Sequence, residues 1–362
     1  MSTQAQLARK MDLNAENLEC EFKQFFKKEL SHKLLEHEPR RLTARRNFII
    51  DLIIGALVFL FFGGPFLFAV VYFFKKVPFA ETLLGVTALV LLFYWIGKCE
   101  HIYRRHKKIL EGKIKAECLP ILLKVIGDDF NWASSAGIQY NIPEKASLYR
   151  AVGGISNIIP TEIINDSAIF RSFRYCVYDD TFSGTYNDMS VFVSEVILGN
   201  MLIDNQPCKT CKGASFCGLI ISLEMNKNFK GHTVVMPEKS RPYQQNRDNK
   251  KDKLERIHLE DVVFEKYFDT YSTDQIEGRY ILTTAFIERL NYIRKIFNTN
   301  DVRCSFRDNR VLIAIASKKD MFSLCELTKR TTNSKLWFKF VQQFRAVLSL
   351  VDILKLNQKI GL

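Results

Sequence analysis

The chain has 362 residues, of which 47% are hydrophobic and 25% are charged, and this composition excludes a disordered tail, a collagen-like repeat and a disulfide scaffold. Its formal net charge of +13 indicates an anionic partner, either nucleic acid or a membrane surface. Residues 33–46 and 98–115 carry net charges of +3 and +5, and both stretches flank apolar segments. We therefore expect the excess of positive charge to bind anionic lipid head groups and no nucleic acid.

Residues 1–47 are predicted to form a cytoplasmic segment that contains an amphipathic helix. Its apolar side chains recur at helical spacing, with Glu and Lys between them: Leu18, Phe22, Phe25, Phe26, Leu30 and Leu34. We expect this stripe to pack within the protein. The alternatives are that it lies on the membrane or pairs with a second copy of the chain in a homo-oligomer.

Residues 48–97 are predicted to form a transmembrane helical hairpin. Leu52 to Phe74 is a run of 23 residues without a charged side chain, and a helix needs about 20 apolar residues to cross a bilayer. A second apolar segment runs from about Phe79 to Gly97, and only residues 75–78 separate the two. Pro65 should kink the first span, because proline removes one hydrogen bond of the helix.

The distribution of basic residues around these spans predicts their orientation. The turn between them has only Lys75 and Lys76, whereas the two other flanks carry Arg40, Arg41, Arg45, Arg46, Lys98, Arg104, Arg105, Lys107 and Lys108. Because basic flanks stay on the cytoplasmic side, both termini should face the cytoplasm. The expected location is the cell (inner) membrane, which the chain crosses more than once.

Residues 98–130 are predicted to form a basic juxtamembrane helix, which Pro120 interrupts or ends. Residues 131–362 have the composition of a cytoplasmic α+β domain with a mainly antiparallel sheet and helices. The predicted strands are Tyr175–Asp179, Met189–Leu198, Gly218–Glu224, His232–Met236 and Val263–Tyr271. Asp180 to Gly184 has the chemistry of a turn, and Arg241 to Lys253 that of a surface loop.

The last third of the chain carries stronger signals of secondary structure. Asp274 is a predicted helix cap, and the helix that it begins should extend to about Phe297. Val302–Phe306 and Val311–Ile315 alternate around Asp308-Asn309, as in a β-hairpin. A long apolar stripe predicts a final helix from about Ser334.

Three cysteines form the most visible metal-like pattern. Cys208 and Cys211 have the spacing at which two thiolates grip one zinc ion, and Cys217 follows closely. A structural zinc site needs four ligands, and no second pair is present. We therefore expect free thiols and no metal, with Cys208, Cys211 and Cys217 as the only zinc candidates.

Carboxylates give a second candidate site. Asp180, Glu195 and Asp274, with Arg279 nearby in the sequence, could hold a cation or serve in acid–base catalysis. The simpler interpretation is that Asp180 shapes a turn and Asp274 caps a helix. The serine-hydrolase, nucleotide-binding, zinc-protease and Cys–His frames are all missing from the sequence, so no cofactor is predicted.

Several short motifs resemble a bacterial family of membrane proteins, the domain of unknown function 3137. They are Tyr140–Pro143, Ser167–Phe170, Asp180 with Gly184, Phe192–Glu195, Asn226–Gly231, Tyr271–Asp274, Arg279–Thr283, Ser305–Asp308 with Ala314–Ile315, and Asp320–Phe322. The resemblance extends over roughly residues 45 to 325. It implies an integral membrane protein with two spans and a cytosolic domain, and it implies no reaction. The cysteines from Cys208 to Cys217 depart from the family pattern.

Two functions follow from these observations. The first is a binding or scaffold module at the inner face of the membrane, which recognises a protein partner or an anionic lipid. The second is a membrane-attached, metal-dependent enzyme that uses Asp180, Glu195 and Asp274. We favour the binding module, because none of the usual catalytic frames is present.

Overall fold

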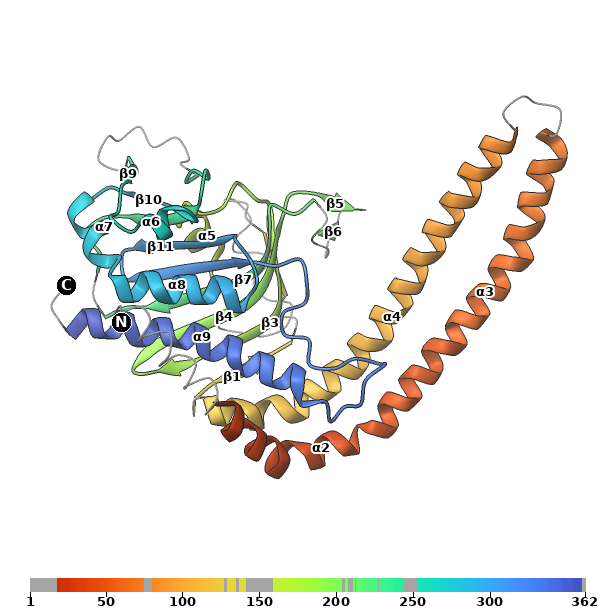
Figure 1. The fold of residues 1–362 in the computed structure, drawn as a ribbon, viewed down its shortest axis with the longest axis horizontal. Helices are drawn as coiled ribbons and strands as arrows, with labels where there is room; N and C mark the ends of the chain where they lie inside the picture. The colour runs from red at the N-terminus through yellow and green to blue at the C-terminus, as the bar shows by residue number, and fades with distance from the viewer. Residues whose placement is uncertain are drawn as a thin grey trace. The chain divides into compact units, whose positions relative to one another are not determined.

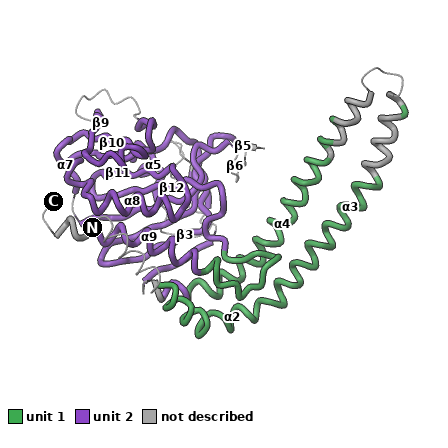
Figure 2. Tube along the Cα trace, viewed as in Figure 1, with its two compact units in different colours: residues 1–121, 324–337 green, residues 122–323, 338–362 purple. Residues whose placement is uncertain are grey.

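A computed structural model describes residues 18–74, 80–126, 129–134, 137–140, 159–203, 206–207, 211, 213–226, 228–243 and 253–359. The chain divides into two compact units (Figure 2). Unit 1 comprises residues 1–121 and 324–337, and unit 2 comprises residues 122–323 and 338–362.

Unit 1 is helical (Figure 1). Residues 18–25 begin a helix that continues as η1 (Phe26–Leu30) and α2 (Ser31–Glu36), and α3 (Glu38–Phe74) and α4 (Ala80–Ile126) follow. The predicted amphipathic helix is confirmed. Four residues of its apolar stripe are buried, with exposed fractions of 0% at Leu30 and Leu34, and Leu18 and Phe25 are half-buried.

Helices α3 and α4 lie side by side and run antiparallel. Phe48 packs edge-on against Tyr103, with ring centroids 5.5 Å apart, and Phe59 packs on Trp95 at the same distance. A polar contact joins the same helices, because Nε2 of His106, three residues beyond Tyr103, lies 2.7 Å from a carboxylate oxygen of Asp51. A side chain at Gly55 would collide with the Trp95 ring, so this glycine allows the close approach of the two helices.

The structure differs from the sequence prediction in where these helices end. Helix α4 is continuous from Ala80 to Ile126 and contains Pro120, which was expected to interrupt or end it. The neighbours of Pro120 explain this, because Cys118, Leu119, Leu122 and Leu123 are all buried and their packing outweighs the lost hydrogen bond. The predicted turn at residues 75–78 lies outside the described residues. Within the part of the chain that the structure describes, no helix has a stretch long and apolar enough to cross a membrane.

A buried polar cluster fastens residues 324–337 to the helices of unit 1. Nη1 of Arg41 donates to the carbonyl oxygen of Leu327 at 2.7 Å, and its Nη2 donates to Glu38 at 2.6 Å. The amide and the hydroxyl of Thr331 both donate to the second oxygen of Glu38. The Arg41 guanidinium, with the Thr331 donors, holds the pKa of Glu38 to about 2.

Unit 2 is built around one large antiparallel sheet. Its strands are β1 (Asn131–Ala133), β2 (Gly137–Tyr140), β3 (Tyr175–Tyr186), β4 (Met189–Gly199), β7 (Phe216–Glu224), β8 (Thr233–Pro237), β9 (Glu255–Ile257), β10 (Phe268–Ser272), β11 (Val302–Arg307) and β12 (Arg310–Ala316). Their order is β1-β3-β4-β7-β12-β11-β8-β10-β9, and β2 also pairs with β3. A separate short hairpin consists of β5 (Leu202–Ile203) and β6 (Gln206–Pro207).

Helices cover both faces of this sheet. On one face, Phe340 and Phe344 of α9 (Ser334–Lys359) pack on Phe182, while Phe286 of α8 (Thr284–Ile296) packs on Phe306. The other face carries α5 (Thr161–Asp166), whose Ile164 belongs to a core shared with strands β3, β4, β7, β8 and β12. The predicted α+β class with a mainly antiparallel sheet is confirmed.

Two local predictions in unit 2 are wrong. Asp180 to Gly184 is not a turn but continues β3, because Thr181 and Phe182 are buried and pair with β4. The chain reverses direction at Asn187 and Asp188, whose φ angles of 50° and 61° suit a tight hairpin. Val263 is not in a strand either. Asp261 caps α6 (Val262–Glu265) by accepting from two amides, and β10 starts only at Phe268.

The C-terminal predictions fit the structure better. Val302–Phe306 and Val311–Ile315 form the hairpin β11–β12, and the last helix begins at Ser334 as predicted. Asp274 caps α7 (Gln275–Ile281), but the predicted single helix is divided, because Thr283 caps the separate helix α8. The surface loop predicted after Arg241 lies mostly outside the described residues.

Replacement of Glu38 tests the buried cluster of unit 1. Glu38→Gln leaves the buried guanidinium of Arg41 without its anionic partner, so we expect a lower midpoint of thermal unfolding at pH 7. The pKa of Glu38 is below its usual value of 4.5, so the carboxylate contributes its full stabilisation above pH 4.5. That contribution is lost as the pH falls towards 2, and the difference between variant and wild type should shrink over the same range.

The matched control is Glu36→Gln, which removes an exposed carboxylate from the neighbouring helix α2. It should leave the unfolding midpoint almost unchanged. Equal midpoints for Glu38→Gln and wild type across this pH range would contradict a stabilising role for the cluster.

Candidate functional site

The structure brings together two of the predicted carboxylates and adds a third. Carboxylate oxygens of Asp180, Glu195 and Asp320 lie within 4.8 Å of one another. Asp180 comes from β3 beside an irregularity in its pairing with β4, Glu195 comes from β4, and Asp320 follows β12. Asp180 is buried, Glu195 is half-buried and Asp320 is exposed.

The environment of this cluster favours a proton on Glu195. Burial, followed by the charges of Asp320 and Asp180, raises the pKa of Glu195 well above its usual value. The amide of Met321 donates to Glu195 at 3.3 Å and opposes this shift only in part. Asp180 accepts a hydrogen bond of 2.9 Å from the indole nitrogen of Trp132. The three carboxylates can therefore coexist by sharing a proton, and oxygen donors this close are also of the type that a divalent cation binds.

Asp274 and Arg279 do not belong to this cluster. Asp274 follows β10, which lies six strands away from β3 in the sheet, and its carboxylate accepts from the amides of Ile276 and Glu277. Arg279 donates to the carbonyl oxygen of His258. Both residues therefore hold together the local structure around α7, as the cap interpretation of Asp274 predicts.

The cysteines differ from the expected free thiols. The structure joins Cys211 and Cys217 in a disulfide, with their Cα atoms 5.5 Å apart. The two are only six residues apart, and Ala214 donates its amide hydrogen to the carbonyl oxygen of Cys211, so the chain turns back on itself between them. A disulfide leaves neither sulfur as a thiolate ligand for zinc. Cys208 lies outside the described residues.

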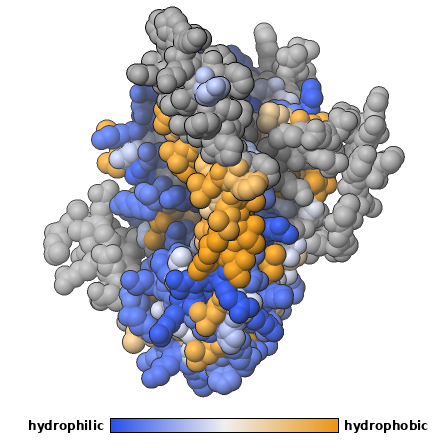
Figure 3. Space-filling model, turned by 90° about the vertical axis from the view of Figure 1, so that its right-hand side faces the viewer, coloured by the Kyte–Doolittle hydropathy of each residue, from blue (hydrophilic) through white to orange (hydrophobic). Residues whose placement is uncertain are grey.

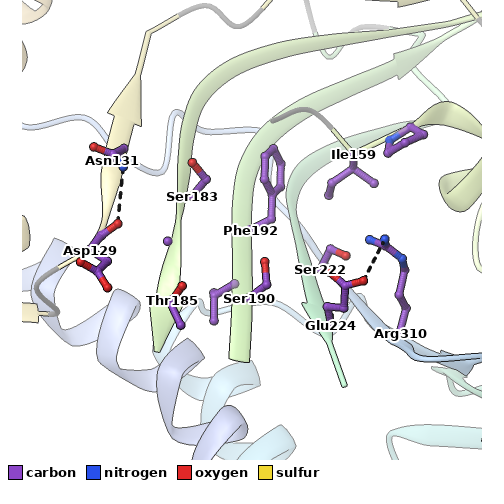
Figure 4. Close-up of a pocket in the computed structure, with 13 residues that line it drawn as sticks. Asp129, Asn131, Ile159, Ser183, Thr185, Ser190, Phe192, Ser222, Glu224 and Arg310 are labelled. Atoms are coloured by element: carbon purple, nitrogen blue, oxygen red, sulfur yellow. Dashed lines mark hydrogen bonds and ion pairs between the residues drawn. The ribbon is translucent and has the colours of Figure 1, made fainter. Parts of the chain in front are cut away.

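A polar cavity of about 420 Å³ lies on the α5 face of the sheet (Figure 4). Its base consists of side chains from β3, β4 and β7. One row across these strands is Ser183, Phe192 and Ser222, and the next is Thr185, Ser190 and Glu224. Asp129 and Asn131 line one side, Arg310 extends the second row on β12, and Ile159 and Pro160 complete the lining.

Local packing fixes the walls of this cavity. A side chain at Gly184 would come within 2.8 Å of the Asp129 carbonyl oxygen, so glycine lets β3 approach this segment closely. At the other end of the cavity, the carbonyl oxygen of Ile159 accepts a hydrogen bond of 2.6 Å from the buried hydroxyl of Tyr178. Glu224 is paired with Arg310 at 3.6 Å and also accepts from Asn309.

The sequence analysis missed both the cavity and Asp320. Serine and threonine at alternate positions of β3 and β4 are common on solvated strands, so they gave no distinct signal. The available clue was positional, because Ser183 and Thr185 occupy two successive positions on one face of β3. Asp320 lies outside the helices and strands, and no spacing rule connects it to Asp180.

Comparisons with known proteins support one of the predictions. The model of the family described as "Protein of unknown function (DUF3137)" matches residues 214–356. Residues 214–356 resemble this family. Five of the quoted motifs lie inside the match, from Asn226–Gly231 to Asp320–Phe322, whereas the motifs before residue 214 lie outside it.

Other comparisons add little. No curated protein matches this chain. A crystal structure of the mycobacterial trehalose monomycolate transport factor A is similar over 64% of this chain and 92% of its own, with 10% sequence identity and a TM-score of 0.31. A likeness this distant supports no inference.

Glu195→Gln tests the crowding of the carboxylates. The raised pKa means that ionised Glu195 destabilises the fold, so stability should fall as the pH rises from 4.5 towards the raised pKa. Gln mimics the protonated form and still accepts from Met321. We therefore expect a higher unfolding midpoint than wild type at pH 7, and a difference that shrinks below pH 4.5.

The control for this experiment is Glu260→Gln, which neutralises an exposed carboxylate elsewhere in unit 2. It should not change the pH dependence of the unfolding midpoint. A midpoint for Glu195→Gln at or below that of wild type at pH 7 would show that the three carboxylates do not repel one another.

Proposed function

We propose that this chain is a membrane-anchored binding module. In this proposal the hairpin of α3 and α4 enters the bilayer, and the sheet domain binds a ligand or a protein partner on the cytoplasmic side. The observation that carries the proposal is a belt of exposed apolar side chains on the paired helices.

The apolar belt consists of large side chains that point to the outside of the hairpin. On α3 they are Ile49, Ile50, Ile53, Ile54, Leu57, Val58, Leu60 and Phe61, and on α4 they are Val86, Leu89, Val90, Leu92, Phe93, Tyr94 and Ile96. The exposed fraction reaches 73% at Phe61 and 69% at Phe93. In Figure 3 an apolar band covers this side of the molecule, with hydrophilic atoms below it. Contiguous apolar surface of this kind is rare on proteins that face only water.

Lipid is the occupant that best fits this belt, because a basic rim borders it. The contact between Phe48 and Tyr103 places Arg45 and Arg46 of α3 level with Arg104 and Arg105 of α4. Basic side chains at one end of an apolar hairpin suit anionic head groups, at about 1 kcal/mol for each residue near the surface. The charge-free run from Leu52 to Phe74 would extend over about 35 Å as a helix.

The binding role of the sheet domain rests on the cavity over β3, β4 and β7. The volume of this cavity, about 420 Å³, is within the range of small-molecule sites, and several polar side chains converge on it. The sequence offers no established catalytic frame, so binding without a reaction is the simplest use of the cavity. An unknown protein partner, and a second copy of the chain, remain candidates for other surfaces of the domain.

The alternative function is a metal-dependent enzyme at the carboxylates. The convergence of Asp180 and Glu195 with Asp320 favours it. Asp274 and Arg279, which the sequence also offered for this site, lie elsewhere on the sheet domain. A shared proton explains the cluster without an ion, so we rank this function second. A titration with MnCl₂ at pH 7 decides the order: a saturable rise of the unfolding midpoint that Asp180→Asn abolishes would place the enzyme first.

Lysine substitutions test the anchor. A variant with Ile54→Lys, Leu57→Lys and Phe61→Lys adds three charges to the belt, each of which costs about 2.5–3.5 kcal/mol at the centre of a spanning helix. We expect wild type to stay in the membrane pellet after alkaline extraction and the variant to move substantially to the supernatant. The measurement is the fraction of the protein in each phase.

The matched control places the same charges on exposed apolar residues outside the belt. Val262→Lys, Ile276→Lys and Tyr280→Lys change side chains of unit 2 that are 81%, 69% and 57% exposed. This variant should remain in the pellet. If wild type itself were recovered in the aqueous phase, the proposed anchor would be refuted.

A reporter at the C-terminus tests the orientation. The basic rim predicts that both termini face the cytoplasm, so alkaline phosphatase fused after Leu362 should be inactive and a fluorescent protein fused there should fold. Alkaline phosphatase activity at this position would reverse the proposed topology. Fusions after Lys76, between the two spans, should give the opposite pair of results.

A further inference from the structure

We propose that the cavity on the α5 face of the sheet binds a neutral, polyhydroxylated ligand, such as one or two sugar units. This inference rests on the proposed function, in which the cavity is the binding site of the module. Four features of the lining carry it: unpaired hydroxyls, a neutralised ion pair, a half-buried aromatic ring and the available volume.

The hydroxyls of Ser183, Thr185, Ser190 and Ser222 line the cavity, and none of the four has a hydrogen-bond partner among the described residues. Ser222 as a residue is 4% exposed, Ser183 is half-buried, and Thr185 and Ser190 are exposed. Figure 4 shows these side chains on neighbouring strands around the open space. Each hydroxyl can both donate and accept, so a ligand with its own hydroxyls can form hydrogen bonds with all four.

The charges of the lining argue against an ionic ligand. Arg310 is its only cationic residue within the described structure, and it is paired with Glu224. Asp129 adds a negative charge, so the lining carries a net charge of −1 and repels anions. The carboxylates of Asp129 and Glu224 do not converge on a cation, because β3 and β4 lie between the segments that carry them. A neutral ligand is not repelled by the net negative charge, and it does not need carboxylates that converge on a cation.

The aromatic ring separates a sugar from other neutral polar molecules. Phe192 is half-buried, with one side packed on the core and its ring in view from the cavity in Figure 4. Sugars combine an apolar C–H face with a rim of hydroxyls, which matches a phenyl ring surrounded by Ser and Thr. A purely apolar ligand would cover the ring but leave the four hydroxyls unpaired.

The volume of the cavity fits a ligand of one or two sugar units. At about 420 Å³ the cavity is in the range of small-molecule sites, about 300–1,000 Å³. The two polar rows extend over β3, β4, β7 and β12, which spaces hydrogen-bonding groups about 4.8 Å apart across the strands. Such a row can contact successive hydroxyls of one or two pyranose rings.

Saturation-transfer NMR on the full chain in lipid nanodiscs tests the proposal, since nanodiscs avoid detergents with sugar head groups. The probes are glucose, maltose, cellobiose and N-acetylglucosamine, with inorganic phosphate as the anionic comparison. We expect saturable transfer from at least one sugar and none from phosphate. Ser222→Ala should weaken that binding about tenfold, and Ser190→Ala with Ser222→Ala about a hundredfold.

The control variant is Ser349→Ala, which removes a hydroxyl that donates to Ala346 in α9, outside the cavity lining. It should bind as wild type does, and all variants should keep the wild-type unfolding midpoint. Absence of binding by all four sugars, or equal affinity in wild type and the double variant, overturns the inference. Binding of phosphate alone would also overturn it while leaving the cavity as the binding site. Failure of the membrane anchor would appear in the extraction experiment and not here.

Discussion

Phe48 against Tyr103, Asp51 beside His106 and Phe59 against Trp95 keep α3 and α4 in one register over several turns. The properties of the hairpin depend on this register. It places Arg45 and Arg46 beside Arg104 and Arg105, and it places the apolar side chains of both helices in one belt. With a shift of two turns, charged residues of one helix would face apolar residues of the other. Aromatic packing and one polar pair thus define the boundary between the charged and the apolar halves of the hairpin.

The sheet of unit 2 shows a comparable division along single strands. On the face covered by α8 and α9, β3 and β4 present Phe182, Val191 and Val193 to the aromatic side chains of those helices. On the other face, β3 begins under the core around α5 and ends in Ser183 and Thr185, whereas the antiparallel β4 begins at Ser190 and ends under that core. The cavity therefore lies where the helical cover stops. The pleat of the strands directs alternate side chains to its base, and Asp129, Ile159 and Pro160 outside the strands complete its walls.

Sequence reasoning succeeded where local chemistry and long-range packing agree. The β11–β12 hairpin was predicted almost to the residue, since Asp308 adopts the positive φ of 53° that its turn needs and both flanking strands are mostly buried. It failed at Asp180 to Gly184, where turn-like residues are held in a strand by the burial of Phe182. Of the site residues, Asp180 and Glu195 were found by their charge, but Asp320 joins them only through the fold. The cavity hydroxyls could not be recognised without knowing which strands are neighbours.

The segment that follows the sheet has a consequence for the order in which the chain matures on the ribosome. Glu111 accepts from the amide of Leu324, 213 residues later, and Glu38 accepts from Thr331, 293 residues later. During translation the two helices emerge long before these partners exist. Glu38 and Glu111 at the base of the hairpin therefore lack these hydrogen bonds until synthesis is almost finished. A nascent chain truncated before residue 324 cannot form them. Quality control that recognises unpaired acidic side chains would have a natural checkpoint at this stage.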